Sequence, residues 1–220
     1  MRSPRRATAL LVSATVTVAL LTGCAAADWN APHPSPSLLG SVGAGFTPPV
    51  APTPEATVHP KPGTWDDARP SPGYRVILLT AGTDAPARAV AKAVRDWAEK
   101  DDVDLRTVNA DAHHVDGIVA AMNEKPDLIV SAGNDLIDAL AVVTASHLDQ
   151  QFLVVGAEVA EPTTNVTAVD WTGASFRGEG LGASSNFDPA SFTRERCADA
   201  VRAGVASVLL GQTGVVLWID

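Results

Sequence analysis

Residues 76–79 read Val-Ile-Leu-Leu, an unbroken apolar run that decides the fold class of this chain. Two similar runs follow, Leu-Ile-Val at 128–130 and Phe-Leu-Val-Val at 152–155. Strands whose apolar residues do not alternate with polar ones are typical of a parallel sheet that is covered on both faces. The three runs therefore predict the central strands of such a sheet.

Helical patterns and further strand patterns surround these runs. Apolar residues recur every three or four positions within 87–97, 115–122, 136–143 and 192–210, which indicates helices. Further strands are expected at 103–108, 166–171 and 215–219. Strands alternating with helices predict right-handed βαβ units. The predicted fold is α/β, a three-layer, doubly wound, mostly parallel sheet in a single Rossmann-like lobe.

The final strand pattern, Val-Val-Leu-Trp-Ile at 215–219, is as apolar as the central runs. An exposed apolar strand invites association, so this one must be covered. We expect it to dock on the edge of the same sheet; the alternative is pairing with another molecule.

The first 23 residues have the parts of a secretory signal. Arginines at positions 2, 5 and 6 precede a short apolar run at 7–21. The run ends in Leu-Thr-Gly-Cys at 21–24, which resembles the lipobox of bacterial lipoproteins. That resemblance implies cleavage before Cys24, a lipid on its sulfur, and a location on the extracytoplasmic face of the cell membrane. An ordinary signal peptide is the alternative, and either the general or the twin-arginine route suits the charged start.

Residues 24–73 are expected to be a lipid anchor followed by a disordered tether. Eleven of the sixteen prolines lie between Pro32 and Pro72, separated by small and polar residues. Such a segment buries too little apolar surface to offset the entropy lost on ordering. The folded domain is expected to span residues 74–220. Within it, Cys197 would have no disulfide partner if Cys24 is lipidated, and its apolar helical setting favours a buried position.

The charge of the chain limits its partners. Formal net charge is −9, and loss of residues 1–23 removes three arginines and no acid, which makes the mature chain −12. A nucleic-acid partner is not expected, because binding needs a basic surface. The same balance argues against electrostatic adhesion to an anionic bilayer.

Polar residues that follow the strands are the candidate ligand-binding residues. Ligands of open α/β sheets bind at the carboxyl ends of the strands. Asp84 and Asn134 are interpreted first as helix N-caps, and the same positions also suit binding of ligand hydroxyls. Trp171 either stacks on a ligand or covers the core. The full candidate set is Asp84, Asn134, Asp135, Glu158, Asp170 and Trp171.

No pattern indicates catalysis, a metal or a cofactor. The polar cluster of Asp111, His113, His114 and Asp116 is interpreted as a helix start, because adjacent histidines on a helix cannot both face one ion. The sequence contains no nucleophile elbow, phosphate loop or dinucleotide fingerprint. We therefore expect a protein that is not an enzyme.

Several motifs occur in order along residues 74–220. They are Asp-Leu-Ile-Val-Ser-Ala-Gly at 127–133, Gln-Phe-Leu-Val-Val at 151–155, Asn-Val at 165–166, Val-Asp-Trp at 169–171, Gly-Glu-Gly at 178–180 and Gly-Gln-Thr-Gly-Val at 211–215. Together they resemble the basic membrane protein family, the substrate-binding lipoproteins of ABC importers. The resemblance implies a type I periplasmic-binding fold, a small ligand such as a nucleoside, and an importer permease as partner.

Three departures from the family pattern accompany the resemblance. No aromatic residue follows Asp84, the acid after the fourth strand is displaced to Glu158, and the sequence stops where the family's second lobe begins. A solute-binding lipoprotein reduced to one lobe is one hypothesis. The other is a surface interaction or sensing module that kept the fold and lost the ligand.

Overall fold

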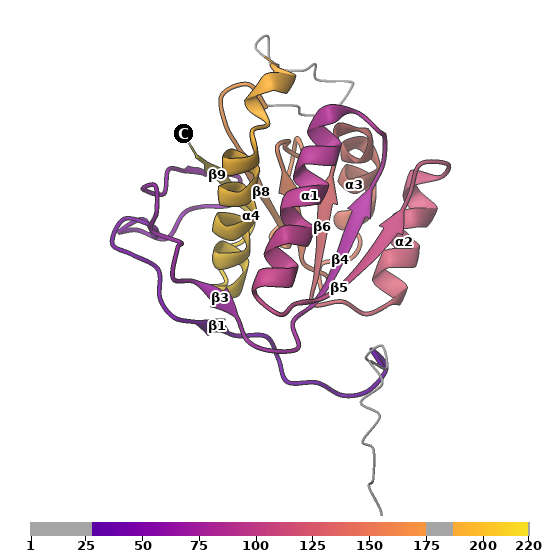
Figure 1. Cartoon of the computed structure of the whole chain (residues 1–220), viewed down its shortest axis with the longest axis horizontal. Helices are drawn as coiled ribbons and strands as arrows, with labels where there is room; N and C mark the ends of the chain where they lie inside the picture. The colour runs from indigo at the N-terminus through magenta and orange to yellow at the C-terminus, as the bar shows by residue number, and fades with distance from the viewer. Residues whose placement is uncertain (1–27, 175–186, 220) are drawn as a thin grey trace, which may run out of the picture.

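The structure, a computed structural model, describes residues 28–174 and 187–219. At its centre lies a seven-stranded sheet in which all neighbouring strands run parallel (Figure 1). In spatial order the strands are β2 (Thr57–Val58), β9 (Val216–Trp218), β8 (Val166–Asp170), β7 (Phe152–Val155), β6 (Leu128–Ala132), β4 (Arg75–Thr80) and β5 (Asp104–Asn109). A separate antiparallel ladder joins β1 (Leu38–Leu39) to β3 (Arg69–Pro70).

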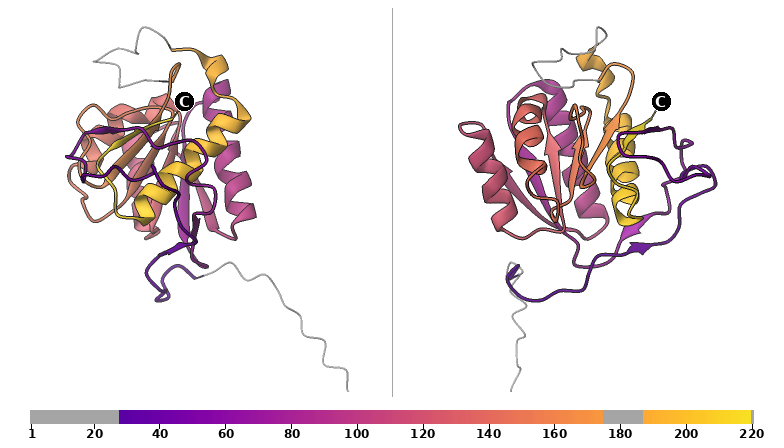
Figure 2. Two further views of the ribbon diagram at one scale, coloured as in Figure 1. Left: turned by 90° about the vertical axis from the view of Figure 1, so that its left-hand side faces the viewer. Right: turned by 180° about the vertical axis from the view of Figure 1, so that it is seen from behind.

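Helices cover both faces of the sheet. Helices α1 (Ala85–Lys100) and α4 (Arg194–Leu209) lie on one face, and α2 (His114–Asn123) and α3 (Ile137–Thr144) lie on the other (Figure 2). The 3-10 turns η1 (Asn134–Leu136) and η2 (Pro189–Ser191) precede α3 and α4. The predicted three-layer, doubly wound α/β fold is therefore confirmed.

Strand β4 shows why the apolar runs do not alternate. Val76 and Leu78 belong to the core beneath α1 and α4, whereas Ile77 and Leu79 belong to the core beneath α2 and α3. None of the four side chains is exposed. Successive strand residues face opposite sides, so a strand covered on both sides must be apolar throughout.

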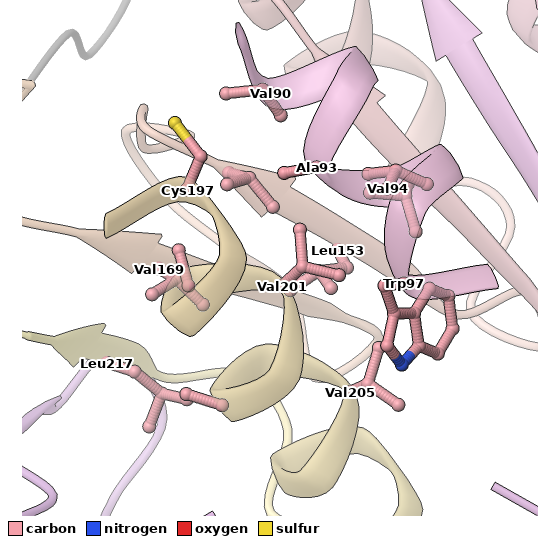
Figure 3. Close-up of a cluster of buried hydrophobic side chains, with 14 of the residues drawn as sticks. Val90, Ala93, Val94, Trp97, Leu153, Val169, Cys197, Val201, Val205 and Leu217 are labelled. Atoms are coloured by element: carbon pink, nitrogen blue, oxygen red, sulfur yellow. The ribbon is translucent and has the colours of Figure 1, made fainter. Parts of the chain in front are cut away.

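The core beneath α1 and α4 is closely packed (Figure 3). A Cβ on Gly204 of α4 would lie 2.5 Å from Leu153 Cδ1, so the helix approaches β7 too closely for any side chain. Cys197 is a free thiol in the same core, which confirms its expected burial. Burial raises the pKa of its thiol to about 11.

The last strand docks within the chain, as expected. Strand β9 pairs with β8, where Leu217 lies opposite Val169. Its other edge is covered by β2, with Thr57 opposite Val216 and Val58 opposite Leu217. Strand β2 comes from the segment that was predicted to be a tether.

The described part of that segment, residues 28–73, is packed on the domain, and the expectation of a disordered tether is wrong for it. Trp29, Phe46 and Trp65 are each at most 3% exposed, and Phe46 meets Trp65 edge-to-face at 6.4 Å between ring centroids. In Figure 1 this indigo and purple chain starts below the foot of β5 and then runs past α4 to β9. Each buried aromatic ring removes roughly 150–250 Å² from water, which offsets the cost of ordering a proline-rich chain.

The predicted signal peptide, Cys24 and the Gly-Glu-Gly motif at 178–180 lie outside the described residues. Among the helices that are described, none combines the length and hydropathy of a membrane span.

Candidate functional site

The strand order places a topological switch point between β4 and β6. From β4 the chain passes through α1 to β5 on one side, and it then returns through α2 to β6 on the other side. The connections that leave β4 and β6 consequently turn toward opposite faces of the sheet. A crevice forms where such connections diverge, and it is the usual ligand site of doubly wound sheets.

Two glycines let these connections approach each other. Gly133 has φ +116°, and a Cβ on it would lie 2.8 Å from the carbonyl oxygen of Ala81. Gly82 has φ +74°, and a Cβ on it would lie 2.5 Å from Oδ2 of Asp135. Both positions combine a backbone conformation that favours glycine with a lack of room for a side chain.

Carboxylates from three connections gather around Gly82. Asp84 caps α1, because its Oδ1 accepts a hydrogen bond from the backbone N–H of Ala87 at 2.7 Å. Asp111 follows β5 and accepts a 2.7 Å bond from the backbone N–H of Gly82. Asp135, in η1 after β6, is exposed and brings its Oδ2 beside Gly82. The three acids make the crevice a hydrogen-bond acceptor surface.

Asp111 has a pKa below its ordinary value. The largest cause is the hydrogen bond from the side chain of Asn109, followed by the bond from the N–H of Gly82, and His114 adds a smaller charge effect. Asp111 is therefore firmly ionised at neutral pH. From the sequence, Asp111 was interpreted only as part of a polar helix start, although its position two residues after a strand was a usable signal.

Asn134 does not cap a helix. It is the first residue of η1, whose N-cap is Gly133 with no side-chain capping bond. Asn134 is half-buried and lies between Gly133 and Asp135 at the carboxyl end of β6.

The other three predicted residues lie at the carboxyl ends of β7 and β8 and are buried. Asp170 has no exposed surface, and its Oδ1 accepts a 2.8 Å bond from the backbone N–H of Trp171. Trp171 is also unexposed; its ring meets Phe192 at 4.9 Å, and its Nε1 donates to Ser191 Oγ at 3.0 Å. Glu158 is 9% exposed. Trp171 thus covers core, which was one of the two predicted roles.

Two hollows lie near the carboxyl edge of the sheet. One, of about 510 Å³, is open to solvent and is lined by polar residues at the start of α2, including Asp111, His113, His114 and Asp116. The other, of about 440 Å³, lies between Gly82 and the basic side chains of α1, Arg88, Lys92 and Arg95. Arg88 donates to the carbonyl of Thr83, and Lys92 pairs with Asp96.

The described residues contain no group of three histidine, cysteine, aspartate or glutamate side chains placed to hold a metal ion. The polar cluster of Asp111, His113, His114 and Asp116 lies at the start of α2, where its predicted role as a helix start placed it.

Comparison with known proteins gives distant structural likenesses. No protein-family model and no curated protein matches the chain. A solute-binding protein of an ABC transporter system from Aeropyrum pernix K1 aligns with 44% of this chain and 28% of its own, at 21% identity and a TM-score of 0.39. Another from Conexibacter woesei DSM 14684 aligns with 44% of this chain and 35% of its own, at 17% identity and a TM-score of 0.38.

A third likeness is to a fragment of a protein named as a lipoprotein, from Peptoclostridium difficile 630. It aligns with 62% of this chain and 98% of its own, at 18% identity and a TM-score of 0.44. The chain spans 28% and 35% of the lengths of the two solute-binding proteins. Likenesses this distant leave the function to be argued from the chain's own residues.

Proposed function

We propose that this chain is a lipid-anchored solute-binding domain on the extracytoplasmic face of a membrane, with a site for a small polar ligand at the carboxyl ends of β4 and β6. The strand order is the main support for this position, because the topological switch point lies between these two strands. The lipobox resemblance at 21–24 supports the anchor. The resemblance to the basic membrane protein family supports an importer permease as partner.

The residues at the switch point suit a ligand rich in hydroxyl or amino groups. Asp135 and Asp84 bring carboxylate oxygens close to Gly82, and Asp84 keeps accepting capacity beyond its bond to Ala87. Asn134, next to Asp135 in the chain, is proposed to add an amide. A ribose offers hydroxyl donors of this kind, in line with the nucleoside that the family resemblance implies. Glu158, Asp170 and Trp171 are proposed to support the site from within the core.

The affinity is expected to be low. The hollow beside the site is open to solvent, whereas tight sites bury most of a ligand's surface. A few polar contacts on one side cannot compensate for the lost freedom of the ligand, so a Kd on the order of 0.1 mM or weaker is expected.

Calorimetry with adenosine and guanosine tests the ligand site. We expect weak binding that Asp135→Asn reduces further, because the substitution removes a negatively charged hydrogen-bond acceptor from the crevice. Asp149→Asn is the matched control, since Asp149 is an exposed carboxylate just before the amino end of β7. Absence of binding by both nucleosides at millimolar concentration, or submicromolar binding, would contradict the proposal.

One observation favours the alternative of a surface interaction module. Val115 and Val119 of α2 are 47% and 39% exposed, and Val142 of α3 is 70% exposed. Both helices cover the same face of the sheet, and exposed apolar side chains on one face are typical of protein interaction sites. If calorimetry detects no binding of either nucleoside, this face becomes the better candidate for the functional surface.

A further inference from the structure

Residues 28–33, at the start of the described chain, are bonded to the amino ends of three adjacent strands, β6, β4 and β5. We name these residues the N-terminal latch. Arg75, the first residue of β4, is only 7% exposed and donates to the carbonyl oxygens of Trp29 at 2.7 Å, Ala31 at 3.0 Å and Asp28 at 3.3 Å. A buried guanidinium needs such partners, so these bonds are costly to break.

The side chains of the latch add contacts to the neighbouring strands. Trp29 is 3% exposed, and its Nε1 donates to Asp104 at the start of β5 at 2.6 Å. The guanidinium of Arg106 stacks on the Trp29 ring, 4.1 Å from the centroid. His33 Nε2 lies 2.8 Å from Oδ1 of Asp127, the residue before β6.

The proposed lipid attachment point is very near this latch in sequence. Three residues separate Cys24 from Asp28, so the chain between them makes four steps of ~3.3–3.6 Å and spans at most about 14 Å. Anchoring at Cys24 would therefore leave little freedom between lipid and domain. The proline-rich residues that follow cannot act as a spacer, because they come after the latch and pack on the domain.

We infer that the latch turns the amino edge of the sheet toward the lipid headgroups and presents the carboxyl edge, with its ligand crevice, away from the membrane. The two edges are separated by the length of β4, six residues or about 20 Å. Figure 1 shows the latch at the foot of β4 and β5, opposite the end where these strands finish. This inference rests on the proposed lipid anchor and adds an orientation to it.

The amino edge would face the bilayer without adhering to it. Its loops carry Asp101, Asp102, Glu124 and Asp149, which outnumber the bases Lys100 and Lys125. Anionic lipids would repel such an edge, so the anchor and the latch supply the orientation.

Energy transfer from the protein to the membrane tests the orientation. The lipoprotein is recovered from membranes and reconstituted in phosphatidylcholine vesicles that contain an acceptor-labelled lipid. A donor dye is attached through an azide-bearing amino acid at Asn123, exposed at the end of α2 on the amino edge, or at Ala190, exposed in η2 beyond β8. We expect transfer from position 123 to exceed transfer from position 190 roughly two-fold or more, given the ~20 Å between the edges.

Two variants identify the cause of this difference. Ten Gly and Ser residues inserted between positions 26 and 27 leave the described domain intact and add a flexible reach of roughly 18 Å, so the difference should shrink. Arg75→Met should shrink it as well by releasing the latch, and the insertion serves as the decisive variant if Arg75→Met does not fold.

Flotation of the same vesicles separates the outcomes. Flotation that is lost in Cys24→Ala, together with greater transfer from position 123, supports both the anchor and the orientation. Flotation with equal transfer from the two positions, or greater transfer from 190, overturns the orientation and leaves the anchor. Failure of the wild-type protein to float overturns both.

Discussion

The two ends of β4, β5 and β6 carry similar polar residues that do different work. At the amino edge, Arg75, Asp104 and Asp127 all bind residues 28–33. At the carboxyl edge, Asp84 accepts a bond from the start of α1, Asp111 accepts one from the connection after β4, and Asp135 is exposed. Residue type alone therefore does not identify a ligand site. The charged groups of the amino edge are bonded to residues 28–33, whereas those of the carboxyl edge keep the capacity to accept further hydrogen bonds.

Trp29→Ala tests the structural role of the amino edge and should have the largest effect. The substitution empties a buried site and removes the bond to Asp104, so the free energy of unfolding should fall by about 3–5 kcal/mol. Urea denaturation measures this change. Val142→Ala, at a 70% exposed position, should change it by less than about 0.5 kcal/mol. Equal effects of the two substitutions would show that the latch is not part of the folded unit.

Gly133→Ala tests how closely the connections approach at the carboxyl edge. Its Cβ would press on the carbonyl oxygen of Ala81, in addition to straining the backbone. Gly211→Ala is the matched control, because Gly211 also has positive φ but has no atom within 4 Å of a Cβ. The control should cost about 1–2 kcal/mol of unfolding free energy. Gly133→Ala should cost about 1–3 kcal/mol more, and equal costs would mean that the connections are not in close contact.

Asn109→Ala tests the electrostatics of the carboxyl edge and should have the smallest effect. It removes the largest cause of the lowered pKa of Asp111, so that pKa should rise toward its ordinary value. A lowered carboxyl pKa stabilises the fold above the unfolded-state pKa, and this small contribution disappears as pH falls through the folded-state pKa. Carbon-13 NMR titration of Asp111 measures the shift. Thr107→Ala, exposed on the same strand, should leave the pKa unchanged, and an unchanged pKa in Asn109→Ala would refute the assigned cause.

The sheet was predictable where burial on both faces made strands apolar throughout. The central runs, the four main helices and the docking of β9 follow from such patterns. The packing of residues 28–73 could not be predicted in this way. Composition shows that the segment is rich in prolines and small residues, but it does not show where a single aromatic side chain packs against the domain. Trp29, Phe46 and Trp65 were the available signal in that segment.

The sequence predicted the edge of the sheet at which the candidate residues lie, but not which of them are exposed there. The rule that ligands gather at carboxyl ends identified Asp84, Asn134 and Asp135, and the switch point between β4 and β6 came only from the strand order. Sequence could not show that Trp171 is covered, since the ring that covers it belongs to Phe192, about twenty residues later in the chain.

A nucleoside titration followed by two-dimensional NMR compares the two edges most directly. With adenosine or guanosine, the amide signals of Gly82 and Gly133 should shift progressively, because these groups line the proposed crevice. The amide signals of Arg75 and Asp127 should stay in place, since the latch occupies that edge. Shifts confined to the amino edge, or no shift at Gly82 and Gly133 at millimolar nucleoside, would contradict the assignment of ligand binding to the carboxyl ends of β4 and β6.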